Sequence, residues 1–315
     1  MNGVKMSTSP GLLLTKPLTV RTFLKLFRIK QWLKNTFIFA ALLFSGQLFI
    51  VEKLVMVTVA FTAFCCISSS VYVLNDIIDC KRDKLHPQKK DRPLAAGVIK
   101  VRNAVIFGVM FLCGSLVIGW NLNLYFFYIL VAYMALNIIY SLWLKNVVFI
   151  DIFVIAFGFV LRVLAGSFVL PVSPSPWLIL CTFLLALFLG LCKRRAEILI
   201  LKKDGISHRQ TLIDYNHNVL IDQLIGMTIS TTIIAYSLYS YYSPIGIKMM
   251  GTIPFVIFTI FRYLFLVYKE EEGGDPANTI LNDRILMFSF VLWVGVTFWL
   301  IYINPYQMAL FRINI

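Results

Sequence analysis

Long apolar stretches that recur along the chain constrain its fold more than any other feature of the sequence. A helix needs about 20 largely apolar residues to cross the hydrocarbon core of a bilayer. Nine segments approach or meet this requirement: residues 35–51, 54–74, 104–120, 124–144, 147–170, 177–192, 219–242, 251–268 and 285–303. Hydrophobic residues make up 59% of the 315 residues and charged residues only 14%, against about 25% charged residues in soluble domains. The sequence therefore predicts an all-α, polytopic membrane protein with about nine transmembrane helices.

The distribution of basic residues predicts the orientation of the chain. With the N-terminus inside, 24 of the 29 Lys and Arg residues fall on inner segments and three on the outer side, as the positive-inside rule requires. The excess of basic residues is thereby explained without a nucleic-acid partner, and we expect none. The chain then divides into a cytoplasmic tail at 1–34, a nine-helix membrane domain at 35–303 and a short extracytoplasmic tail at 304–315.

The inner loops predict where the protein works. The loops at 75–103 and 193–218 are long and rich in ionisable residues, and such loops are often functional. We therefore expect a cytoplasmic active site in a protein of the cell (inner) membrane.

An acidic motif follows the second apolar segment. The run N-D-I-I-D-C-K-R-D extends from Asn75 to Asp83. If the helix continues through it, Asp76, Asp79 and Asp83 fall within an arc of about 60°, and Asn75 shares their face. Clustered carboxylates repel one another unless a cation lies between them, and Mg²⁺ is bound by such hard oxygen ligands. The alternative is a solvated helix end whose carboxylates pair with Lys81, Arg82 and Lys84.

Two basic motifs are expected on the same side of the membrane. The loop H-P-Q-K-K-D-R-P-L-A-A-G carries Lys89 and Arg92 between Pro and Gly residues, and K-R-R-A-E carries Lys193, Arg194 and Glu197 at the end of the sixth segment. Arginine can bind a phosphate through two nitrogens. These residues are candidate phosphate ligands, although basic residues that flank a span are also routine interfacial anchors.

Arg162 is a further candidate because it lies inside a predicted span. An ionisable group at membrane depth is expensive and tends to face a cavity or a partner. The alternative to a substrate-binding role is a structural ion pair with Asp151.

The two ends of the membrane domain supply the remaining candidates. Lys30 and Lys34 precede the first segment in R-I-K-Q-W-L-K-N, and Asp283 and Arg284 precede the last in L-N-D-R. Structural alternatives are an interfacial anchor for the first pair and a helix cap for Asp283.

The acidic motif with the following R-P-L-A-A-G resembles the NDxxDxxxD motif of the UbiA superfamily of intramembrane prenyltransferases. The aromatic prenyltransferases of that superfamily have a second acidic motif, DxxxD, where this chain has K-R-R-A-E. The whole set of R-I-K-Q-W-L-K-N, N-D-I-I-D, H-P-Q-K-K-D-R-P, K-R-R-A-E and L-N-D-R resembles the decaprenyl-phosphate phosphoribosyltransferases within it, over residues 20–300.

The resemblance implies a UbiA-like helical bundle and a reaction. It implies Mg²⁺-dependent transfer of 5-phosphoribosyl from phosphoribosyl diphosphate to a polyprenyl phosphate of the membrane, used in cell-envelope biosynthesis. The metal and catalytic residues would be Asp76, Asp79 and Asp83, with Asn75 beside them. The substrate phosphates would be divided among Lys30, Lys34, Lys89, Arg92, Arg162, Lys193, Arg194, Glu197, Asp283 and Arg284.

Two other functions stay open at this point. One is an ordinary prenyltransferase that moves a prenyl group from a polyprenyl diphosphate to an aromatic acceptor. The other is a transporter for an anionic lipid, whose charges would line a path across the membrane. The oligomeric state is also open, with a homo-oligomer as one alternative.

Overall fold

The computed structural model describes residues 19–84, 89–204, 218–269 and 276–303, and this part of the chain consists of helices and connecting turns with no strand. The elements of the first half are α1 (Val20–Leu26), the 3₁₀ helix η1 (Ile29–Phe39), α2 (Ala40–Phe44), α3 (Val51–Ile78), α4 (Cys80–Asp83), α5 (Val101–Leu122), α6 (Leu124–Leu142) and η2 (Leu144–Asn146). Those of the second half are α7 (Ile150–Val169), α8 (Pro176–Asp204), α10 (Asn218–Tyr242), α11 (Ile247–Met250), α12 (Ile253–Lys269), α13 (Pro276–Asn282), α14 (Arg284–Phe298) and the π-helical η3 (Trp299–Ile303).

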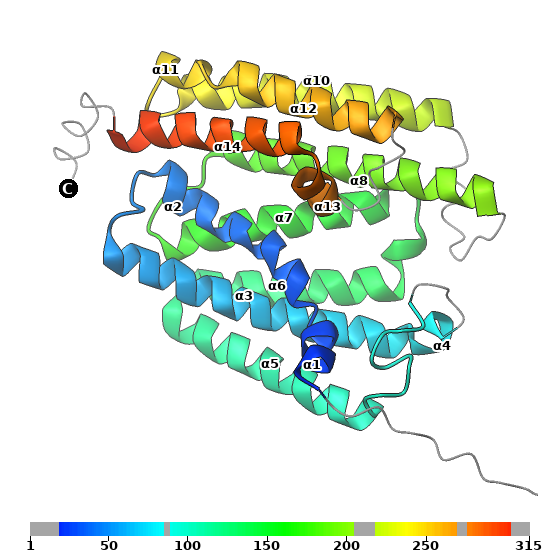
Figure 1. Cartoon of the computed structure of the whole chain (residues 1–315). Helices are drawn as coiled ribbons and strands as arrows, with labels where there is room; N and C mark the ends of the chain where they lie inside the picture. Colours follow the sequence, from blue (N-terminus) through cyan, green and yellow to red (C-terminus); the bar gives the residue numbers. More distant parts are fainter. Residues whose placement is uncertain (1–18, 85–88, 205–217, 270–275, 304–315) are drawn as a thin grey trace, which may run out of the picture.

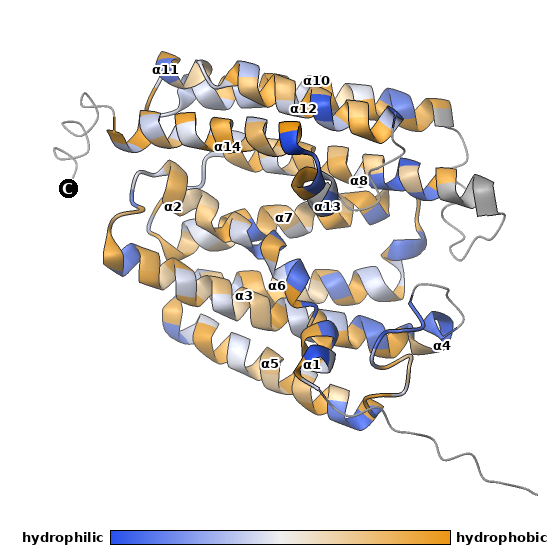
Figure 2. Ribbon diagram, viewed as in Figure 1, coloured by the Kyte–Doolittle hydropathy of each residue, from blue (hydrophilic) through white to orange (hydrophobic). Residues whose placement is uncertain are grey.

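Eight helices in the described ranges are long and apolar enough to cross a membrane. They contain α3, α5, α6, α7, α8, α10, α12 and α14, and their outer surfaces are largely apolar (Figure 2). Large side chains such as Trp120 and Phe288 are more than 60% exposed on these surfaces, as expected where lipid covers the protein. The prediction of an all-α, polytopic membrane protein is confirmed.

The first predicted span, 35–51, differs from the expected transmembrane helix. It consists of the end of η1, the short α2 and the start of α3. Together η1 and α2 extend about 30 Å, since a 3₁₀ helix rises about 2.0 Å per residue. The segment packs tightly on α7, because a Cβ atom on Gly166 would lie 1.9 Å from the carbonyl oxygen of Ile38. A broken segment of two short helices therefore stands where the sequence predicted the first of nine helices.

Two apolar cores lie on either side of α7. One contains Phe64 and Phe126 and joins η1, α2, α3, α6 and α7. The other contains Phe188 and Tyr263 and joins α7, α8, α10 and α12. Because α7 belongs to both cores, it fixes the two halves of the bundle relative to each other.

One end of the bundle collects the candidate site motifs. The C-termini of α3, α6, α8 and α12 and the N-termini of α5, α7 and α10 lie there, on the right of Figure 1. Helix α14 begins nearer the middle of the view, beside α13. Helices α3 and α8 extend beyond their predicted spans at this end. We call it the polar end. The expected tail at 304–315 lies outside the described residues.

Candidate active site

The acidic motif does not form one continuous helix. Helix α3 ends at Ile78, Asp79 caps it, and a separate short helix, α4, ends at Asp83. Asp76 and Asp83 both accept hydrogen bonds from the same nitrogen of Arg92, Nη1, at 3.1 and 2.6 Å. Asp79 points elsewhere and accepts from Lys145 Nζ at 2.8 Å. Only two of the three carboxylates therefore converge on one point.

Arg28 completes this acidic centre from the N-terminal segment. Its guanidinium donates to Asp76 and lies 4.8 Å from the centroid of the Tyr72 ring. Its backbone is left-handed, with φ 49° and ψ 50°, at the junction of α1 and η1. A residue other than glycine adopts this conformation only when its surroundings fix it. The contacts of the Arg28 side chain with Asp76 and Tyr72 hold this turn in place.

The partners of the carboxylates differ from those expected for a solvated helix end. Lys81, Arg82 and Lys84 are exposed, whereas the three carboxylates contact Arg28, Arg92 and Lys145. The sequence motifs do not predict Arg28 or Lys145 as site residues. The sequence held only weak signals for them: Arg28 is one of several tail cations, and Lys145 is the single basic residue of an inner turn.

Asp76 and Asp83 are the carboxylates of the acidic motif that could hold a divalent cation. Within the described ranges, no group of three or more His, Cys, Asp or Glu side chains is placed to hold a metal ion. Mg²⁺ in proteins is commonly bound by one or two carboxylates together with substrate phosphates. Because one guanidinium nitrogen of Arg92 lies between Asp76 and Asp83, that point already holds positive charge. The pair fits a cation if Arg92 moves aside.

Asn75 is fixed by α6. Its side-chain oxygen accepts a hydrogen bond from Ser141, whose hydroxyl also contacts the Asn137 carbonyl at 2.7 Å. Asn75 thus positions the end of α3 against α6, and it does not contact a carboxylate of the motif in the described contacts.

Lys89 links the two inner motifs electrostatically. Its side chain reaches solvent, yet partial desolvation and the Arg92 guanidinium lower the pKa of its ammonium group. The carboxylates of Asp83, Glu197 and Asp79 oppose this shift. Since Glu197 belongs to α8 and Asp79 follows α3, carboxylates of the acidic motif and of K-R-R-A-E both act on this ammonium group.

The K-R-R-A-E motif contains an internal ion pair. Arg194 is buried, donates to Asp151 at 2.8 Å and also donates to Glu197. It is therefore held by two carboxylates, while Lys193 is exposed on the same helix. Arg195 contacts Asp222 of α10 at 2.9 Å.

Arg162 lies away from the acidic centre. It donates to Asn35 at 2.8 Å, to the Gly158 carbonyl at 2.7 Å and to the Tyr133 hydroxyl at 3.0 Å. The alternative of an ion pair with Asp151 is wrong, because Asp151 lies about three turns away on α7, roughly 16 Å along the helix axis. Asp151 pairs with Arg194 instead. Arg162 instead holds η1 against α7.

The candidate residues at the two ends of the membrane domain are three exposed basic residues and one helix N-cap. Lys30, Lys34 and Arg284 are exposed. Asp283 caps α14 by accepting from the Leu286 amide at 2.6 Å, and two nitrogens of Arg262 contact its carboxylate at 3.1 and 2.6 Å. The hydrogen bonds from Arg262 hold the pKa of Asp283 below its ordinary value. These contacts favour the structural alternative for Asp283.

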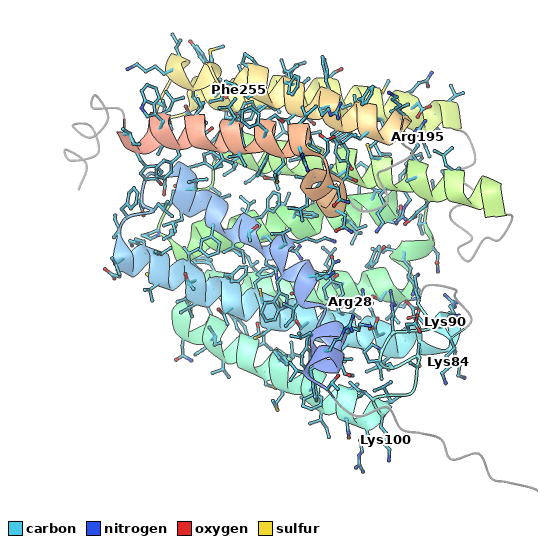
Figure 3. All side chains as sticks on the ribbon, in the orientation of Figure 1. Arg28, Lys84, Lys90, Lys100, Arg195 and Phe255 are labelled. Atoms are coloured by element: carbon cyan, nitrogen blue, oxygen red, sulfur yellow. The ribbon has the colours of Figure 1, made fainter. Side chains whose placement is uncertain are left out.

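Figure 3 shows the polar end with side chains drawn. Arg28, Lys84 and Lys90 lie near the end of α3, and Arg195 lies near the end of α8 on the same side of the molecule. The arrangement provides carboxylates for a cation and several cations for phosphates within one region.

Known proteins resemble this chain over most of its length. The decaprenyl-phosphate phosphoribosyltransferase of Mycolicibacterium smegmatis is 30% identical over 294 residues, covering 88% of this chain and 91% of that protein. The protein of the same name from Mycobacterium tuberculosis is 31% identical over 285 residues, covering 86% and 91%. The corresponding protein from Corynebacterium glutamicum is 31% identical and covers 90% and 87%.

Solved structures share the fold. A UbiA homologue from Archaeoglobus fulgidus bound to GPP and Mg²⁺ matches with a TM-score of 0.68 and 20% identity, covering 89% of this chain and 99% of that chain. A UbiA homologue from Aeropyrum pernix matches with a TM-score of 0.59 and 15% identity, covering 90% and 97%. The profile of the UbiA prenyltransferase family matches residues 35–292. With this match over most of its length and a UbiA fold, the chain belongs to the UbiA prenyltransferase family.

Proposed function

We propose that this protein transfers 5-phosphoribosyl from phosphoribosyl diphosphate to a polyprenyl phosphate and releases diphosphate. The observation that carries the proposal is the charge of the polar end. Two carboxylates converge on one cation position, and the region otherwise contains Arg28, Lys89 and Lys145 with the basic start of K-R-R-A-E. Three phosphate-bearing groups, two on the donor and one on the acceptor, require such an excess of cations. The similarity to the phosphoribosyltransferases supports the same reaction.

The chemistry needs positioning and charge stabilisation more than proton transfer. An oxygen of the lipid phosphate would form a bond to C1 of the ribose, and the bond from C1 to the diphosphate oxygen would break with its electron pair leaving on diphosphate. No general base is needed, because a phosphate monoester is anionic at neutral pH. The residues of the polar end would hold the leaving diphosphate through fixed positive charges, which stabilise charge that develops during the reaction.

Asp76 and Asp83 would hold Mg²⁺ together with the diphosphate, with Asp79 close by. A bound Mg²⁺ would supply charge neutralisation at the leaving group. Arg92 and Arg28 would turn from these carboxylates to the phosphates of the donor. The Archaeoglobus homologue, which is bound to GPP and Mg²⁺, supports a divalent cation for this fold.

We place the polar end in the cytoplasm and the protein in the cell (inner) membrane. The support is the 24 basic residues on segments assigned to that side by the sequence. Phosphoribosyl diphosphate is a soluble, highly charged compound, so the donor must reach the site from water. The lipid product would enter cell-envelope biosynthesis.

The second candidate function is prenyl transfer from a polyprenyl diphosphate to an aromatic acceptor. The fold and the acidic motif favour it, since the Archaeoglobus homologue binds the prenyl diphosphate GPP. It gives the cations at K-R-R-A-E no substrate to bind, although Arg194 and Arg195 pair with carboxylates of the chain. A transporter is disfavoured because most charged side chains of the described residues lie at the polar end and a few, such as Lys53 and Lys248, lie at the opposite end. Between the two ends, only Arg162 and Arg262 fall within the described spans, so no charged path crosses the bundle.

The test is transfer by the purified protein in detergent. Radiolabelled phosphoribosyl diphosphate and a polyprenyl phosphate would be incubated with Mg²⁺ or with a chelator, and label would be counted in the lipid phase. We expect labelled lipid only with Mg²⁺. If no labelled lipid forms and the protein instead transfers a prenyl group from a polyprenyl diphosphate to an aromatic acceptor, the proposed reaction is wrong. The lipid is then the donor and not the acceptor.

A further inference from the structure

An apolar groove lies beside the polar end on the surface of the bundle. Its volume is about 390 Å³, its floor is formed by Leu187 and Leu191 of α8, and its walls come from α7 and α10. Phe153 of α7 and Met227 of α10 line the walls and are 45% and 67% exposed. The groove is therefore open to the hydrocarbon core of the bilayer.

Two ion pairs stand at the cytoplasmic end of this groove. Arg194 and Arg195 follow Leu191 by three and four residues, so they continue the groove face of α8. Arg194 contacts Asp151 of α7, next to the groove residue Ile152, at 2.8 Å. Arg195 contacts Asp222 of α10 at 2.9 Å, and the groove residue Leu224 lies two positions further on. Each wall is thus tied to the floor by a guanidinium.

The Arg194 guanidinium lies between the groove and the acidic centre. Arg194 contacts Asp151 with one side and Glu197 with the other. The Glu197 carboxylate acts on the Lys89 ammonium, as do the carboxylates of Asp79 and Asp83. Charged side chains therefore lie both at the end of the groove and at the end of α3.

We propose that this groove binds the isoprene units of the polyprenyl phosphate nearest its phosphate, which then lies at Arg194 and Arg195. The inference rests on the proposed function, because it assigns the acceptor to a site. An anionic group joined to an apolar chain matches a groove with apolar walls and guanidinium groups at one end. The phosphate would replace the carboxylate of Asp151 or Asp222 as the partner of a guanidinium. An ordinary phospholipid also joins an anionic head group to apolar chains, so the test must distinguish binding of polyprenyl phosphate from binding of phospholipid.

The groove can be probed by photocrosslinking without turnover. The full-length protein in nanodiscs would receive a polyprenyl phosphate carrying a diazirine in its second isoprene unit, with no donor present. We expect crosslinks to peptides of α7, α8 and α10 that line the groove. Excess unlabelled polyprenyl phosphate should reduce them at least about fivefold, whereas the same excess of phosphatidylglycerol should not. Crosslinks elsewhere, or equal competition by phosphatidylglycerol, would overturn the assignment.

A matched pair of variants tests the groove during catalysis. Thr231 lines the groove and Ile234, three residues further along α10, is exposed to lipid outside the groove lining. Thr231→Trp should raise the KM for polyprenyl phosphate about tenfold through lost apolar contact and leave the KM for phosphoribosyl diphosphate unchanged. Ile234→Trp should change neither constant. An unchanged acceptor KM in Thr231→Trp would contradict the proposal.

The two proposals fail in different ways. If the groove is labelled but the protein transfers no phosphoribosyl group, the proposed reaction is wrong and the lipid-phosphate site stands. If transfer is normal and the groove is not labelled, the reaction stands and the acceptor enters elsewhere.

Discussion

At the scale of single residues, the acidic centre is a set of charges balanced within the chain. Asp76 is 2% exposed and Asp83 is 4% exposed, and both contact Arg92. A buried carboxylate without a partner is costly, so a guanidinium or a metal ion must stay between them. The motif predicted the residue types, but not the partners. Arg28 and Lys145 lie 48 and 66 residues from the carboxylates that they contact, beyond the reach of local spacing.

The first prediction concerns the carboxylate that contacts both arginines. Asp76→Asn keeps the shape of the side chain and removes the charge that would hold the cation. We expect phosphoribosyl transfer to fall by about 100-fold or more, with an increased Mg²⁺ requirement for the residual activity. Asp91→Asn, in the exposed part of the following loop, is the matched control and should retain activity. Near-normal transfer in Asp76→Asn would exclude the assignment of the cation.

The second prediction uses the lowered pKa of Lys89. Because its pKa lies below the ordinary 10.5, the ammonium loses its proton at a lower pH than an exposed lysine does. If its charge holds an anionic donor, kcat/KM should fall as pH rises through that lowered pKa. Lys89→Arg keeps the charge and should move the alkaline limb to higher pH, whereas Lys90→Arg should not. If kcat/KM falls at the same alkaline pH in the wild type, Lys89→Arg and Lys90→Arg, Lys89 does not control this fall.

At the scale of elements, the long helices could be predicted and the breaks could not. Runs of about 20 apolar residues predict membrane helices by hydropathy alone. The same criterion predicted a membrane helix at residues 35–51. In the structure, buried Asn35 contacts Ser68 at 3.1 Å and Arg162 at 2.8 Å. These contacts come from α3 and α7, so only the tertiary structure reveals why η1 is a 3₁₀ helix. The end of α3 at Ile78 was missed for the same reason.

The third prediction tests the packing of η1 on α7. Gly166→Ala would place a Cβ atom 1.9 Å from the Ile38 carbonyl oxygen, so η1 must move and carry Arg28 away from Asp76. We expect a lower Tm in detergent and a reduced transfer rate. Gly114→Ala, where a Cβ atom meets nothing within 4 Å, should leave the rate unchanged and preserve or raise the Tm. Equal behaviour of the two variants would contradict the close packing of η1.

At the scale of the whole molecule, alternating helix directions bring the acidic motif and K-R-R-A-E to the polar end. Consecutive long helices run in opposite directions, so inner loops far apart in sequence lie together there (Figure 1). The positive-inside pattern predicted this grouping, because it assigned the loops at 75–103 and 193–218 to one side. The groove between α7, α8 and α10 could not be predicted, since it depends on how three helices pack.

The fourth prediction concerns orientation. A cysteine replacing Lys100, which is exposed at the polar end, should react with a membrane-impermeant maleimide only after cells are opened. A cysteine replacing Lys53, at the start of α3 on the opposite end, should react in spheroplasts. Both would be made with Cys113→Ser, because Cys113 is an exposed native thiol. The reverse pattern would place the polar end outside the cell.

The most direct test of the central claim is the mass spectrum of the lipid product. Purified protein would be given phosphoribosyl diphosphate, a polyprenyl phosphate and Mg²⁺, and the lipid extract and released diphosphate would be measured together. The proposed reaction predicts a lipid that keeps its phosphate, gains one phosphoribosyl unit and appears in equal amount to diphosphate. An unchanged lipid under these conditions, with a prenylated acceptor formed from polyprenyl diphosphate by the same preparation, would contradict it.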